Sequence, residues 1–331
     1  MIGRRALLGA AAAVPALRRA GAQTGGAETW MPQRPMRMVV PFAPGGILDQ
    51  LARLIAEPMG RRLGQPVVVE NRAGAGGNVG TALVARARGD AQTILVGSTG
   101  PLAVSPIIEP QLGYDPLTDL VPITLLNATP LVLVVRKDSP YRDVPGLVAA
   151  LKADGREVLY PTPGVGSPQL LAQEAFRQAA GFPAAPVHYP GSAPAVLAVI
   201  SGEFPFTIEN LVLVAPHVSR GALRALAVTS QARAAMLPGV PTMAEQGFPG
   251  FSAGGWYGLL SPAGVPEEVV RALHAAAVAA LAEPDVARRI NEMGGPPIGS
   301  SPAEFRAHIA AETARWRGVL AAAARPGTAQ R

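Results

Sequence analysis

Short apolar runs rich in valine, isoleucine and leucine alternate along this chain with longer segments of helical periodicity, and this alternation constrains the fold most strongly. The predicted strands are Met36 to Pro41, Val67 to Val69, Thr93 to Val96, Leu131 to Val135, Glu157 to Tyr160, Phe204 to Ile208, Leu223 to Val228 and Trp256 to Leu260. The predicted helices are Leu48 to Leu63, Val79 to Arg86, Val144 to Ala153, Gln169 to Ala180, Pro194 to Ser201, Pro266 to Ala282 and Pro302 to Ala323. A capping box of Ser301 and Glu304 predicts the start of the last helix. Strands separated by crossover helices predict an α/β protein with parallel sheets.

Size and composition place the chain among globular proteins. A length of 331 residues suggests about two domains, and 49 % apolar against 16 % charged residues is far from a disordered composition. The absence of cysteine excludes disulfides, thiolate metal sites and cysteine nucleophiles.

The first 22 residues have the pattern of an export signal peptide. Arg4 and Arg5 precede an apolar stretch, Ala6 to Leu17, and Ala20 to Ala22 offer a small-residue cleavage site. The start resembles a twin-arginine signal, but an arginine pair just before the cleavage site is unusual for either export route and leaves the route open. A short amphipathic helix is the alternative. The sequence therefore predicts a protein of the periplasm.

Charge gives no indication of a nucleic-acid partner. The signal carries four of the 29 basic residues and none of the 23 acidic ones, so the mature chain has 25 basic residues and a net charge of +2. The remaining basic residues occur at most in pairs. We therefore expect no nucleic-acid binding, whereas a weak positive balance is compatible with an anionic small ligand.

A glycine-rich loop follows the first predicted strand and precedes a helix. It comprises Phe42, Ala43, Pro44, Gly45 and Gly46. Backbone N–H groups at a helix N-terminus favour a carboxylate or phosphate, so the loop is a candidate anion site, although proline and glycine also simply make turns. In the first helical turn, the aspartate at position 49 (Asp49) either favours the helix dipole or recognises a ligand amine or hydroxyl.

A second loop of the same kind contains Thr162, Pro163, Gly164, Gly166 and Ser167 and precedes another helix. Ser167 is a predicted N-cap because proline occupies the first helical position after it. Capping and ligand contact remain alternatives for this serine. Two such loops in the two halves of one chain suggest two jaws around one ligand.

Other motifs do not predict catalysis. The glycine cluster from Gly74 to Gly80 lacks the spacing of a dinucleotide fingerprint, and no acidic residue follows the next strand. The four histidines are scattered singly, without metal-ligand spacing. We therefore expect no catalytic residue, no metal and no cofactor, although catalytic partners need not be sequence neighbours.

Several motifs together resemble the Bug family of extracytoplasmic receptors, which serve tripartite tricarboxylate transporters. They read Val40-Pro41-Phe42-Ala43-Pro44-Gly45-Gly46, Gly64-Gln65-Pro66-Val67-Val68-Val69-Glu70-Asn71-Arg72, Gly74-Ala75-Gly76-Gly77-Asn78, Gly164-Val165-Gly166-Ser167-Pro168, Leu237-Pro238-Gly239-Val240-Pro241-Thr242 and Trp256-Tyr257-Gly258-Leu259. The resemblance implies a type II periplasmic binding fold, in which crossing hinge strands join two α/β lobes. Lobe 1 would comprise residues 33–130 and 256–331, and lobe 2 residues 131–255.

The resemblance also implies a function and a site. The family's two glycine loops hold the carboxylate of a small ligand, with Ser98, Thr99, Glu209 and Asn210 as further wall residues here. Closure of the lobes would capture the ligand, and a monomer would deliver it to a membrane permease. Presentation to a sensor, or a hydrolase or oxidoreductase on the same scaffold, are the alternatives.

Three positions in lobe 2 depart from the family pattern. Gln169 stands where the family usually has histidine, and Ala198 and Pro205 stand where it usually has aspartate. The identity of the ligand therefore cannot be carried over from the family.

Overall fold

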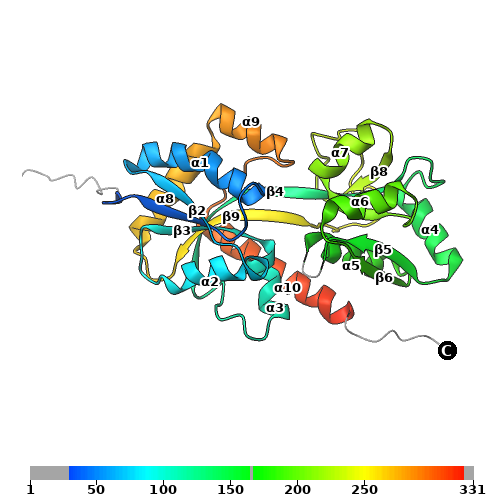
Figure 1. The fold of residues 1–331 in the computed structure, drawn as a ribbon, viewed down its shortest axis with the longest axis horizontal. Helices are drawn as coiled ribbons and strands as arrows, with labels where there is room; N and C mark the ends of the chain where they lie inside the picture. Colours follow the sequence, from blue (N-terminus) through cyan, green and yellow to red (C-terminus); the bar gives the residue numbers. More distant parts are fainter. Residues whose placement is uncertain (1–29, 165–166, 324–331) are drawn as a thin grey trace, which may run out of the picture.

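The computed structural model describes residues 30–164 and 167–323, so the predicted signal peptide lies outside the described residues. Figure 1 shows two groups of helices and strands, separated along the long axis of the molecule and joined by two long strands and the last helix. We call the group that contains the first strand lobe 1 and the other group lobe 2. The architecture confirms the predicted α/β class.

Lobe 1 is built on a five-stranded arrangement in which parallel and antiparallel neighbours are mixed. Its strands, in spatial order, are β2 (Val67–Asn71), β1 (Met36–Val40), β3 (Thr93–Ser98), β9 (Gly254–Pro262) and the first part of β4 (Leu120–Arg136). The strand β1 is parallel to β2 and β3, whereas β9 is antiparallel to both β3 and β4.

Helices cover both faces of this sheet. They are α1 (Ile47–Leu63), η1 (Ala75–Gly77), α2 (Asn78–Arg86), η2 (Gly100–Val104), α3 (Ser105–Ile108), α8 (Glu267–Leu281) and α9 (Pro284–Glu292). Side chains alternate between the faces of a strand, so Met38 and Val40 pack with α1 and α8, whereas Val39 packs with α2. Both faces are therefore buried, as the apolar composition of the strands requires.

Lobe 2 contains the second part of β4, which pairs antiparallel with β7 (Thr207–Asn210) and β8 (Leu223–Val228). A separate parallel pair consists of β5 (Val158–Thr162) and β6 (Ala184–His188). The helices are α4 (Val144–Asp154), α5 (Pro168–Ala180), α6 (Ser192–Ile200) and α7 (Leu211–Ser219).

Three elements link the lobes. The antiparallel strands β4 and β9 pair from Leu120 opposite Pro262 to Pro130 opposite Gly254, and β4 then continues into lobe 2. The last helix, α10 (Pro302–Ala323), runs from lobe 1 to α5 of lobe 2, where Gln178 donates a hydrogen bond from Nε2 to the carbonyl of Val319 at 2.8 Å.

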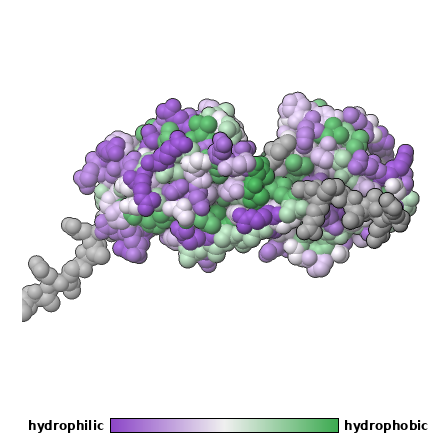
Figure 2. Space-filling view, turned by 90° about the horizontal axis from the view of Figure 1, so that it is seen from below, coloured by the Kyte–Doolittle hydropathy of each residue, from purple (hydrophilic) through white to green (hydrophobic). Residues whose placement is uncertain are grey.

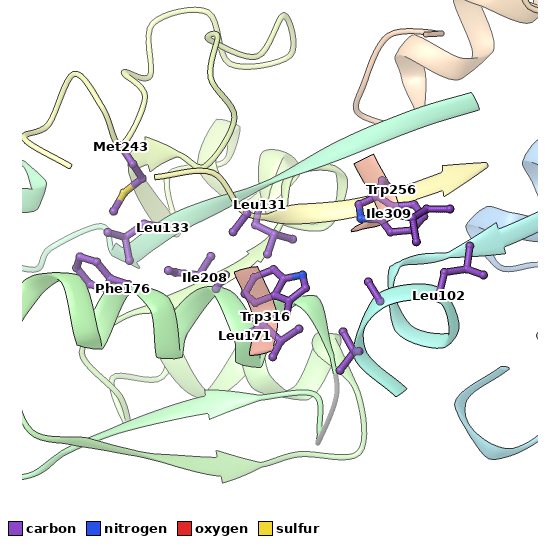
Figure 3. Packing of buried hydrophobic residues seen from close by; sticks show 14 of the residues in the cluster. Leu102, Leu131, Leu133, Leu171, Phe176, Ile208, Met243, Trp256, Ile309 and Trp316 are labelled. Atoms are coloured by element: carbon purple, nitrogen blue, oxygen red, sulfur yellow. The ribbon is translucent and has the colours of Figure 1, made fainter. Parts of the chain in front are cut away.

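A continuous hydrophobic core passes beneath this connection. In Figure 3, Trp316 of α10 lies beside Leu131 of β4 and Leu171 of α5, and Trp256 of β9 lies near Ile309. The indole of Trp316 is fully buried. The last helix therefore packs against both lobes.

The prediction of parallel sheets is only partly correct. Parallel pairing holds for β1 with β2 and β3 and for β5 with β6, but every pairing of β4 and β9 is antiparallel. The two linking strands run in opposite directions because the chain leaves lobe 1 along β4 and returns along β9. Six elements, η1, η2, α3, β6, α7 and α9, were not predicted at all.

Helix signals in the sequence were more accurate. The capping box at α10 is present, since Glu304 accepts from the Ser301 N–H at 2.8 Å and donates its own N–H to Ser301 Oγ at 3.2 Å.

None of the helices in the described part of the chain combines the length and apolarity needed to cross a membrane.

Candidate functional site

A cavity of about 460 Å³ lies between the two lobes. Its walls are formed in lobe 1 by Ile47, Gln50, Tyr257, Glu292 and Met293, in lobe 2 by Asn210, Leu211, Val212 and Leu213, and at the hinge by Thr129. Figure 2 shows the molecule hollowed by a notch between the lobes. The volume is within the usual range for small-molecule sites, and Ile47 and Leu211 are the first residues of α1 and α7. Two helix N-termini from different lobes therefore meet at one cavity.

The first glycine loop precedes Ile47, the first lining residue of α1, but none of Phe42 to Gly46 is itself among the lining residues of the cavity. Ala43, Pro44, Gly45 and Gly46 are exposed, and Gly45 has a φ of 89°, a conformation that glycine adopts without strain. No side chain caps α1 at Gly46, which leaves the first N–H groups of the helix available to an anion. Phe42 is anchored, because its carbonyl accepts a hydrogen bond from Asn71 Nδ2 at 3.1 Å.

Asp49 holds this loop in place. Its carboxylate is 4 % exposed and accepts hydrogen bonds from the Gly45 N–H at 2.9 Å, Asn71 Nδ2 at 3.0 Å and Arg53 Nε at 3.0 Å. The hydrogen bond from the Arg53 guanidinium is the main cause that lowers the pKa of Asp49 from 3.8 to about 2. The contacts therefore favour a positioning role for Asp49 over direct recognition of a ligand.

The second glycine loop is held by its own side chains. Ser167 Oγ accepts from the Leu170 N–H at 3.2 Å and donates to the Gly164 carbonyl at 2.8 Å, so its predicted N-cap role is confirmed. Thr162 is buried, Pro163 is half-buried, and the Gly164 N–H lies 3.5 Å from Thr162 Oγ1.

Like the first glycine loop, this loop supplies no lining residue of the cavity, so the two loops as jaws around one ligand stay a prediction. Gly166 lies outside the described residues. Of the predicted residues that are described in this loop, none contributes to the lining of the 460 Å³ cavity. The lobe 2 wall is formed instead by the start of α7.

Ser98 and Thr99 lie buried at the end of β3. Thr99 Oγ1 accepts a hydrogen bond from the Trp256 N–H at 2.9 Å, which ties the end of β3 to the strand that returns from lobe 2. The hydroxyl of Thr99 is thus engaged by the hinge.

Glu209 and Asn210 end β7, and only Asn210 reaches the cavity wall. Glu209 is fully buried, and its Oε2 accepts from the Asn210 N–H at 3.0 Å and from Gln169 Nε2 at 3.2 Å. Its Oε1 has no hydrogen-bond partner among the described residues. Burial raises the pKa of Glu209, because the hydrogen bonds from Asn210 and Gln169 offset only part of the lost hydration.

The three departures from the family pattern have different surroundings. Gln169 is 5 % exposed and contacts both Glu209 and Ser192 Oγ, at 3.2 and 3.1 Å. Ala198 packs in the hydrophobic core of lobe 2, and Pro205 is half-buried just before β7. Gln169 is thus the departure that changes the polar environment below the cleft.

Sequence reasoning missed the apolar wall of the cavity. Val212 in the first turn of α7 is 42 % exposed, and Met293 follows the end of α9. An apolar run directly after a polar strand end was a visible signal at α7, but neither helix had been predicted. In residues 30–164 and 167–323, no group of three or more acidic or histidine side chains could hold a metal ion.

Two α/β lobes, crossing hinge strands and a cavity between the lobes define the architecture of a solute-binding protein. Comparison with known sequences gives the family: the model described as "Tripartite tricarboxylate transporter family receptor" matches residues 51–324. The chain belongs to this receptor family, which confirms the resemblance seen in the motifs.

Individual relatives agree with this assignment. Protein BugT of Bordetella pertussis is 39 % identical over 89 % of this chain and 90 % of its own. R. palustris Rpa4515, solved with adipate, has a TM-score of 0.74 at 35 % identity and covers 88 % of this chain and 98 % of its own. MatC from Rhodopseudomonas palustris, with bound malate, has a TM-score of 0.72 at 32 % identity and covers 88 % of this chain and 100 % of its own. The type II periplasmic binding fold is therefore confirmed, and the family is one of solute receptors.

Proposed function

We propose that this protein is an exported periplasmic receptor that captures a small carboxylate between its lobes and delivers it to the permease of a tripartite tricarboxylate transporter. The observation that carries the proposal is the 460 Å³ cavity at which the N-termini of α1 and α7 meet. The adipate and malate bound by two relatives support a carboxylate ligand.

Carboxylate binding would rest on backbone groups. Neither α1 nor α7 has a side-chain cap, so each offers uncompensated N–H groups and the positive end of its dipole. A ligand in contact with both helices interacts more strongly with the closed than with the open arrangement, and therefore shifts the population toward closure. No covalent step is required.

Capture between two lobes also divides the chain into two parts that move relative to one another. Residues 33–130 and 256–331 would form one moving lobe and residues 131–255 the other, with β4 and β9 as hinge strands. Because α10 also packs against α5, closure must keep or reposition that contact. We propose that the receptor acts as a monomer without metal or cofactor.

Thermal unfolding against a panel of mono-, di- and tricarboxylates and their uncharged amides tests the proposal. A ligand at 100 times its dissociation constant stabilises a native state by about 2.7 kcal/mol. We expect stabilisation by at least one carboxylate and by none of the amides. The absence of a shift with every carboxylate would contradict the proposal.

A matched pair of variants locates the site. Gly46 has an ordinary φ, and a Cβ there would meet only the Ala43 carbonyl at 3.9 Å, so Gly46→Leu should fold while obstructing the N-terminus of α1. Gly239→Leu, in an open loop of lobe 2, is the control. The first variant should abolish the shift and the second should keep it. Ligand uptake into cells with and without the permease then tests delivery.

A further inference from the structure

The chemistry of the cavity narrows the class of ligand. We infer that the receptor selects a monocarboxylate with an apolar body, of the size of phenylacetate or hexanoate, over di- and tricarboxylates. This inference rests on the proposed function and concerns the same cavity.

The first argument is the apolar wall on both sides of the cleft. Six of the ten lining residues are apolar or aromatic, and they are Ile47, Tyr257 and Met293 in lobe 1 and Leu211, Val212 and Leu213 in lobe 2. Because both lobes contribute, an apolar ligand body buries surface on each of them when they close, and this favours the closed state.

Val212 is the clearest case. Val212 is a large hydrophobic residue, yet it is 42 % exposed. It lies in the first turn of α7 and lines the cavity. A Cβ placed on Gly294 would lie 2.8 Å from Val212 Cγ2, so α7 already approaches lobe 1 closely next to Met293. Val212 thus lies where the two lobes meet around the ligand.

The second argument is the charge of the walls. Among the described residues, the lining contains no lysine, arginine or histidine, and its one charged residue is the acidic Glu292. The buried carboxyl group of Glu209 lies next to the lining residue Asn210, and Asp49, in the first turn of α1, is a second acidic residue near the cavity. One ligand carboxylate can bind to helix N–H groups, but a second one would lose its hydration without a cation to replace it.

Basic side chains lie in an adjoining cavity of about 440 Å³, which shares Gln50, Glu292 and Met293 with the first one. Arg53 there is already paired with Asp49 at 2.9 Å. Arg289 lines the same space beside Glu292, so a long diacid that reached it is the competing outcome.

Calorimetric titration of the purified protein with phenylacetate, hexanoate, adipate, malate and citrate tests the inference. We expect phenylacetate or hexanoate to bind at least tenfold more tightly than each of the three polyacids. Val212→Asn should weaken binding of that monocarboxylate about tenfold, since it removes apolar contact area from the wall. Leu197→Asn is the matched control, because Leu197 is an exposed leucine of α6, 57 % exposed, outside the cavity lining. This variant should bind like the wild type.

The outcomes separate the two claims. Tighter binding of adipate, malate or citrate would overturn the inference and leave the proposed function intact. An unchanged affinity in Val212→Asn would overturn the assignment of the apolar body to this cavity. Binding of none of the five acids would overturn the inference, whereas only the absence of a shift with every carboxylate of the wider thermal-unfolding panel would overturn the proposed function.

Discussion

Replacing Asp49 by asparagine removes the charge that fixes the first glycine loop while keeping the shape of the side chain. In the folded protein the carboxylate accepts hydrogen bonds from Gly45, Asn71 and Arg53. The difference between a pKa of 3.8 and one of about 2, at 1.36 kcal/mol per pKa unit, corresponds to about 2.4 kcal/mol. Because the Arg53 side chain is 54 % exposed, solvent screening reduces the expected loss to about 1 to 2 kcal/mol.

The pH dependence of this loss follows from the direction of the shift. A carboxyl group whose pKa is lowered in the folded state contributes its stability above the unfolded pKa, near 4, and loses it as the pH falls toward 2. Denaturant unfolding of the wild type and Asp49→Asn should therefore differ by about 1 to 2 kcal/mol at pH 7. This difference in the free energy of unfolding should become smaller between pH 4 and pH 3.

A matched control separates this effect from any surface charge. Asp138 also pairs with an arginine, Arg136, but its side chain is 67 % exposed, so Asp138→Asn should cost less than about 0.5 kcal/mol. An Asp49→Asn variant as stable as the wild type at pH 7, or equally destabilised at pH 7 and pH 3, would refute the reasoning.

Three further substitutions test other parts of the structure. Trp316→Ala, at a fully buried position of α10, should cost about 3 to 5 kcal/mol in denaturant unfolding, and a loss below about 1 kcal/mol would contradict its role as a link between the lobes. Burial raises the pKa of Glu209, so its ionisation opposes folding. The stability of Glu209→Gln relative to the wild type should therefore increase as the pH rises from 5 to 8. A stability difference between the two proteins that does not change with pH would contradict this. Gly294→Ala should lose about 1 to 3 kcal/mol, since position 294 has a φ of 102° and the added Cβ meets Val212; a stability equal to the wild type would show that the turn adapts freely.

Local signals in the sequence predicted the helix starts well. The Ser301 and Glu304 capping box and the Ser167 N-cap depend on residues within a few positions of one another, so the sequence contains the whole interaction. The start of α1 after Gly46 follows from the same kind of local chemistry.

The full length of the strand that links the lobes could not be predicted from local sequence signals. The strand β4 extends from Leu120 to Arg136, but only the part from Leu131 to Val135 was predicted. Pro122 and Pro130 interrupt the earlier part, and proline removes a donor from the ladder, so the pattern resembles a loop. Pairing with β9 across a register shift near Pro122 makes it a strand.

Of the predicted site residues in the described part of the chain, Asn210 lines the cavity, whereas both glycine loops lie outside the lining. Glycine before a helix is a local signal, which is why the start of α1 after Gly46 was predicted, whereas Val212 and Met293 come to line one cavity only because α7 and α9 lie on opposite sides of it. Asp49 lies in the first turn of α1, as predicted, but its partner Asn71 comes from another strand, and the partner of Thr99, Trp256, comes from the strand that returns from lobe 2. The roles of such residues depend on tertiary contacts.

Lobe closure on a carboxylate is the central claim, and energy transfer between one dye on each lobe tests it most directly. The chain contains no cysteine, so Asp285→Cys in α9, with a 92 % exposed side chain, and Leu197→Cys in α6 provide two specific labelling sites. A carboxylate that binds by calorimetry should raise the transfer efficiency, while its uncharged amide should leave the efficiency unchanged. Binding of the carboxylate without any change in transfer efficiency would contradict capture by lobe closure.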